Sequence, residues 1–138
     1  MDVMDMNSII KASNVMQQHR PGLSIYDLNA ALERLGGSRE LLCDMIGFYL
    51  EDYPVLIERI EDAADAGDPV TLARNTHSLK GLAANFDAMQ VIAAAEATTL
   101  AARKSVGLVP EKEIATLSKA ASELAEHLQS ALEDDESD

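Results

Sequence analysis

Apolar residues at helical spacing constrain the fold of this chain more than any other feature of the sequence. Toward the C-terminus they follow one another in steps of three and four, at Ile114, Leu117, Ala121, Leu124 and Leu128. Such steps place one apolar stripe along a helix and leave its other face polar. No segment sustains an apolar-polar alternation, and no repeat of fixed length is present. The sequence therefore predicts an all-α protein.

Helix start and stop signals divide the rest of the chain. Ser38 is a typical N-cap after Gly36-Gly37, Gly67 is a typical helix end, and Asp68-Pro69 combines an N-cap with a proline at the first helical position. Pro54 falls inside the longest helical segment and is expected to kink it. The expected helices cover approximately residues 26–35, 39–66, 69–85, 87–104 and 110–132.

The expected domain organisation is simple, because 138 residues fit one domain. Residues 1–22 form an N-terminal arm or short helix, residues 23–132 form the bundle, and residues 133–138 form an acidic tail. Short connections favour antiparallel neighbours. We therefore expect an up-and-down antiparallel four-helix bundle with an additional N-terminal helix or arm. We expect it to be monomeric, because a bundle of four helices already buries its apolar stripes.

Charge and composition exclude several classes of function. The chain has 24 acidic and 11 basic residues and a formal charge of -13, which opposes binding to nucleic acid or to an anionic membrane surface. The N-terminus lacks the basic start of a secretory signal, so we expect a cytoplasmic protein. Cys43 is the single cysteine, and His19, His77 and His127 show no ligand spacing, so we expect no metal site.

The helix expected at residues 69–85 carries the candidate site. At about 100° per residue, Leu72, Leu79 and Ala83 point away from His77, so His77 should face solvent. His19 and His127 lack such a setting. Residues three, four or seven positions from His77 share its side of the helix and form a candidate binding face. They are Val70, Ala73, Arg74, Lys80, Gly81 and Ala84.

Two of these neighbours favour phosphate chemistry at His77. Lys80 lies one helical turn away, where its ammonium can offset the charge of a phosphoryl group. Gly81 costs about 1 kcal/mol in a helix relative to alanine, so close approach of a phosphate or a partner would explain it. An imidazole in water is mostly neutral at pH 7, which leaves a ring nitrogen free to attack phosphorus.

The segment Thr76–Phe86, with His77, Lys80 and Gly81, resembles the motif of histidine-containing phosphotransfer (HPt) domains. The similarity extends over roughly residues 23–132. The resemblance implies that His77 accepts a phosphoryl group from a receiver-domain aspartate and passes it to another response regulator. The expected partners are receiver domains and a hybrid sensor histidine kinase. The resemblance also implies no ATP binding, no autokinase activity and no cofactor, with Mg²⁺ belonging to the receiver.

Two positions depart from the family pattern. Asp87 stands where the family usually has glycine; we expect it to tolerate a left-handed conformation and to cap the next helix, with Gln90 completing a capping box. Thr76 replaces a common alanine and should point to the flank of the bundle.

A docking module that is never phosphorylated is the alternative function. A kinase fragment is disfavoured, because Ser78 follows the histidine where kinases usually have an acidic residue.

Overall fold

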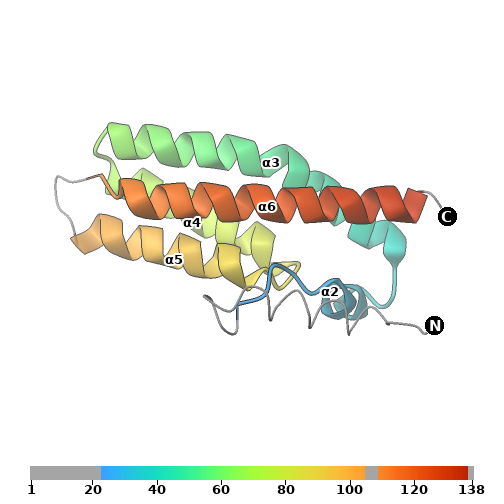
Figure 1. The fold of residues 1–138 in the computed structure, drawn as a ribbon. Coiled ribbons are helices and arrows are strands. Elements are labelled where there is room, and N and C mark those ends of the chain that lie inside the picture. Colours follow the sequence, from blue (N-terminus) through green and yellow to red (C-terminus); the bar gives the residue numbers. More distant parts are fainter. Residues whose placement is uncertain (1–22, 105–108, 137–138) are drawn as a thin grey trace.

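The computed structural model describes residues 23–104 and 109–136, and within these ranges it contains helices and no strand. Figure 1 shows how they are arranged. Their bounds are α2 (Leu28–Arg34), α3 (Arg39–Asp65), α4 (Pro69–Ala84), α5 (Met89–Lys104) and α6 (Glu111–Glu136).

Helices α3 to α6 form a four-helix bundle. Each packs against the next in the chain, and α6 closes the ring against α3, so α4 and α6 occupy diagonal positions. Helix α2 is added at the end of the bundle and packs against α3. The expected all-α bundle is confirmed. The arm expected at residues 1–22 lies outside the described residues.

The helix starts follow the signals in the sequence. The Ser38 side chain accepts a hydrogen bond from the Leu41 amide at the start of α3. Asp68 accepts one from the Thr71 amide at the start of α4, where Pro69 is the first helical residue. Hydrogen bonding from Thr71 lowers the pKa of the Asp68 carboxyl below its ordinary value.

Helix α3 ends before Gly67, whose φ of +66° lies in the left-handed region that glycine adopts without strain. Pro54 lies inside α3, and Figure 1 shows the N-terminal part of this helix turned out of line with the remainder. A proline inside a helix produces such a bend because it removes a backbone hydrogen bond. Helix α6 continues to Glu136, so the acidic tail expected from residue 133 is helical at its beginning.

The core is built mainly from aliphatic side chains and alanine around one aromatic pair. Tyr49 and Phe86 are fully buried with their rings edge to face at 6.0 Å. The Tyr49 hydroxyl donates a 2.8 Å hydrogen bond to the Ala121 carbonyl oxygen, which ties α3 to α6. Burial raises the pKa of this hydroxyl. Other fully buried side chains include Ile46, Ile60, Leu72, Leu79, Leu117, Leu124 and Leu128.

The turn between α4 and α5 differs in part from the expectation. Asp87 has a φ of +51°, so the predicted left-handed conformation is confirmed. The predicted capping box is wrong, because the Gln90 amide donates to the Ser24 carbonyl and the Asp87 amide donates to the Ala84 carbonyl. The Asp87 carboxylate instead accepts a 2.9 Å hydrogen bond from Arg34. Tertiary contacts with residues 23–34 thus replace the local cap.

Candidate functional site

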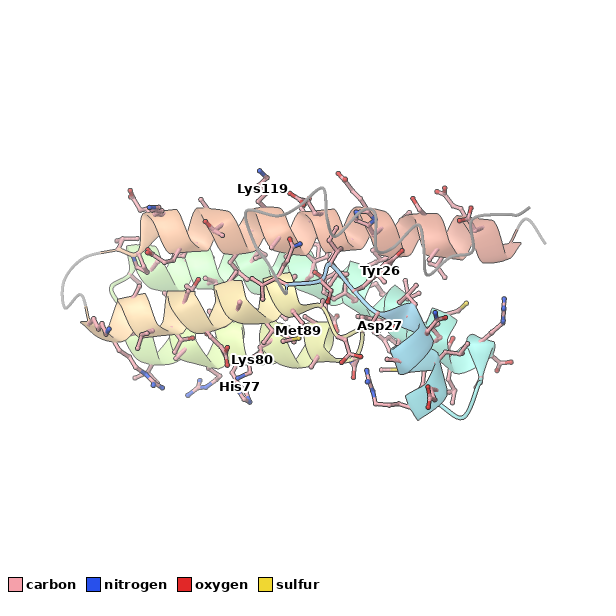
Figure 2. The ribbon with its side chains drawn as sticks, turned by 60° about the horizontal axis from the view of Figure 1, so that its bottom comes forward. Tyr26, Asp27, His77, Lys80, Met89 and Lys119 are labelled. Atoms are coloured by element: carbon pink, nitrogen blue, oxygen red, sulfur yellow. The ribbon has the colours of Figure 1, made fainter. Side chains whose placement is uncertain are left out.

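His77 is exposed in the middle of α4, opposite the buried residues Leu72, Leu79 and Ala83. Figure 2 shows His77 and Lys80 projecting from the same side of the bundle, while Lys119 of α6 projects from the opposite side. The outward direction predicted from helical spacing is therefore confirmed. The imidazole is accessible to a partner protein.

The residues predicted to share the side of His77 do lie on the surface of α4. Val70 is 67% exposed, and Arg74, Gly81 and Ala84 are also exposed, while Ala73 and Lys80 are partly buried. Ala73 and Lys80 line a groove between α4 and α5, Gly81 lines a groove between α3 and α4, and the other three line neither groove. Their part in binding a partner stays a prediction.

One groove, of about 400 Å³, lies between α4 and α5 and includes His77. Its α4 wall consists of Ala73, Thr76, His77 and Lys80, and its α5 wall consists of Ala95, Glu96, Thr99, Leu100 and Arg103. The imidazole thus shares a depression with two cationic side chains and one carboxylate. Sequence reasoning found the α4 residues and missed the entire α5 wall.

Lys80 forms an ion pair across this groove. Its Nζ atom lies 3.2 Å from Glu96 Oε2, and the two side chains are 37% and 60% exposed. An ion pair this exposed is weak, typically about 0.2–1 kcal/mol. The ammonium predicted to serve a phosphoryl group therefore has a protein partner in the unmodified molecule.

The backbone beneath His77 is held in place by a pair of threonines. Thr76 is 1% exposed, and its hydroxyl lies 2.6 Å from the Thr99 hydroxyl of α5. Thr76 Oγ1 also lies within hydrogen-bond distance, 2.9 Å, of the Ala73 carbonyl oxygen. Thr76 therefore points away from the exposed surface, as predicted, but it is buried against α5 rather than placed on the flank of the bundle. This contact fixes α4 relative to α5 next to His77.

The second groove, of about 570 Å³, lies between α3 and α4 and includes Gly81. A Cβ atom built on Gly81 would meet nothing within 4 Å, so packing among the described residues does not require glycine. Close approach of another molecule is consistent with this observation.

Helix α3 carries an exposed apolar strip that the sequence did not single out. Leu41, Phe48 and Val55 follow one another at intervals of seven and are 49%, 58% and 46% exposed. Their heptad spacing places the three side chains along the same side of α3. Val55 lines the α3–α4 groove together with Gly81.

Two further findings concern the described residues as a set. Within residues 23–104 and 109–136, no group of three or more His, Cys, Asp or Glu side chains could hold a metal ion. Of the helices in these ranges, none combines the length and the hydropathy of a membrane-spanning segment.

The sequence matches the model of a known family of signalling domains. The Hpt domain family model matches residues 44–134, which is more than half of the chain, and the chain therefore belongs to this family. Membership places the protein in phosphorelay signalling, in which a histidine carries the phosphoryl group. None of the curated proteins compared with the chain gave a match.

A solved structure is similar in fold. It is the HPT domain from the Hpt sensor hybrid histidine kinase from Shewanella, with a TM-score of 0.68 and 18% sequence identity. The similarity covers 80% of this chain and 95% of that one. At this identity the comparison supports the bundle architecture alone.

Proposed function

We propose that His77 accepts a phosphoryl group from a receiver-domain aspartate, such as that of a hybrid sensor histidine kinase, and passes it to another response regulator. The observation that carries this proposal is an exposed imidazole on a packed helix, with Lys80 and Gly81 in the next turn. The family membership supports the same class of chemistry.

The transfer step is a displacement at phosphorus. A lone pair on one ring nitrogen of neutral His77 attacks the phosphorus of the aspartyl phosphate. The bond between phosphorus and the aspartyl oxygen breaks, and its electron pair leaves on the carboxylate. The second ring nitrogen keeps its proton, so the step needs no separate base. The reverse reaction delivers the group to a second receiver.

The helix geometry supplies positioning rather than acid-base chemistry. Fixing the imidazole on α4 removes much of the orientational entropy that a free imidazole would lose in the transfer. Lys80, one turn from His77, can offset charge on the phosphoryl oxygens. We propose that Mg²⁺ belongs to the receiver and that the protein itself is a carrier without ATP binding or autokinase activity.

The docking face combines the predicted residues with the apolar strip of α3. Val70, Ala73, Arg74 and Ala84 surround His77 on α4. Val55 lines the α3–α4 groove, and the exposed Phe48 precedes it by seven residues on α3. Exposed apolar side chains beside a polar reactive group are typical of a protein-binding surface. We propose that a receiver domain docks here, on a monomeric bundle.

A phosphotransfer assay tests the proposal. Receiver domains phosphorylated with acetyl phosphate in the presence of Mg²⁺ are mixed with the protein, and acid-labile phosphate on the protein is measured. Wild type should be labelled and His77→Gln should not. His127→Gln is the matched control, because His127 is also exposed but lies on α6, diagonal to α4. ATP alone should give no label.

Two results would overturn the proposal. Label that survives in His77→Gln would place the phosphoryl group elsewhere. Receivers that bind the protein but never label it would favour the docking module that is not phosphorylated.

A further inference from the structure

The ion pair between Lys80 and Glu96 bears directly on the state of the site. Lys80 Nζ lies 3.2 Å from Glu96 Oε2, so in the unmodified protein the ammonium is directed toward α5. Glu96 and His77 line opposite walls of the same groove. Of the residues that line this groove, Glu96 is the single acidic one. A negative charge therefore stands beside the position where a phosphoryl group would be attached.

The carboxylate opposes phosphorylation of His77 in two ways. It competes with the phosphoryl group for the Lys80 ammonium, and it repels the negative charge of the phosphoryl oxygens. Both effects favour the unphosphorylated protein. The other cation of the groove, Arg103, makes no ion pair within the described part of the chain and does not relieve this competition by binding Glu96.

The competition can be resolved by a side-chain movement alone. Lys80 and Glu96 are 37% and 60% exposed, so their ion pair is screened by solvent and can be exchanged for a more highly charged partner. The contact between Thr76 and Thr99, at 2.6 Å, holds the two helices together while the ammonium moves. A phosphoryl group carries about two negative charges against one on Glu96, so the ammonium is expected to transfer to it.

We propose that Glu96 is a tuning residue that holds Lys80 away from His77 in the resting protein and thereby makes His77 a weaker phosphoacceptor and a better donor. This inference rests on the proposed function, because it assumes that His77 is phosphorylated. It goes beyond it by assigning a role to a residue on α5 that no sequence motif marks. Glu96 acts mainly through Lys80 and in smaller part by repelling the phosphoryl oxygens, and it does not itself take part in the transfer.

The test compares four proteins: wild type, Glu96→Gln, Lys80→Met and the double variant. Glu126→Gln is the matched control, since it removes one exposed carboxylate from α6, diagonal to the site. Phosphoramidate serves as a donor that needs no docking surface: its P–N bond breaks, ammonia leaves, and the phosphoryl group bonds to the imidazole. The rate of labelling is measured, followed by the labelled fraction at equilibrium with a receiver domain.

Glu96→Gln should increase both the labelling rate and the labelled fraction by about two- to five-fold, the range that an exposed ion pair can account for. The increase should be smaller in the Lys80→Met background. It should also shrink in about 1 M salt, where the Debye length is about 3 Å. Glu126→Gln should be labelled like wild type. The melting temperatures of Glu96→Gln and wild type should be similar, because a merely structural role for Glu96 would lower the stability without raising the labelling rate.

Three results would overturn the inference while leaving the proposed function intact. The first is no increase in labelling rate in Glu96→Gln. The second is an increase of equal size in the wild-type and Lys80→Met backgrounds, and the third is an increase of equal size in Glu126→Gln. Absence of label on wild type with both donors would instead refute the proposed function itself.

Discussion

Replacing Gly81 with alanine should stabilise the fold and impair transfer from a receiver at the same time. Gly81 lies inside α4, is exposed, and has no positive φ, and an added Cβ would meet nothing within 4 Å. The backbone entropy that glycine loses on folding then dominates, and alanine should add about 0.5–1 kcal/mol of stability. This corresponds to a melting temperature about 2–6 °C higher for a domain of this size.

Transfer should change in the opposite direction, because a partner that packs against the bare backbone at Gly81 would meet the new methyl group. Overpacking costs about 1–3 kcal/mol. If the transition state for transfer bears this cost, kcat/KM for transfer from a receiver falls by roughly 5- to 150-fold. Labelling by phosphoramidate should change much less, because this donor needs no protein interface.

Gly47→Ala in α3 is the matched control. Gly47 also lies within a helix, and a Cβ there would also meet nothing within 4 Å, but it lines neither groove beside α4. It should raise the melting temperature similarly and leave transfer unchanged. A lower melting temperature in Gly81→Ala would contradict the predicted gain in stability. Transfer as fast as wild type from every receiver that labels the protein would contradict close approach of a partner at Gly81.

Three further predictions concern the fold. Tyr49→Phe removes a buried hydrogen bond to α6 and should lower the free energy of unfolding by about 0.5–1.5 kcal/mol in urea titrations; an unchanged midpoint would contradict the role of the hydroxyl. Asp87→Ala and Asp87→Gly both lose the ion pair with Arg34, but only alanine keeps a side chain at a φ of +51°. The glycine variant should therefore be more stable than the alanine variant by about 1 kcal/mol. Equal stabilities of the two variants would contradict backbone strain at residue 87. Because the pKa of Asp68 is lowered in the folded protein, its ionised form adds stability above pH of about 3.9 that is lost as pH falls through the folded pKa. Asp68→Asn should therefore melt below wild type at neutral pH, and the difference should narrow in acid; a difference that persists in acid would contradict this.

Local signals in the sequence predicted most of the fold. Ser38 and Asp68 cap their helices because a side-chain oxygen reaches an amide within the same turn, which depends on nearby residues alone. The outward direction of His77 followed from helical spacing for the same reason. The Asp87 turn shows where such reasoning fails. Its conformation was predicted correctly, but its carboxylate pairs with Arg34, a residue more than fifty positions earlier.

The sequence by itself determined the helices, their order and the side of α4 that carries His77, because spacing and capping act over a few residues. Only the tertiary structure decided which helix faces that side and how far each helix is rotated about its axis. This packing places Glu96 Oε2 3.2 Å from Lys80 Nζ and leaves Phe48 and Val55 exposed. Contacts between helices depend on packing of the whole bundle, and no local pattern in one helix specifies the residue opposite it in the next.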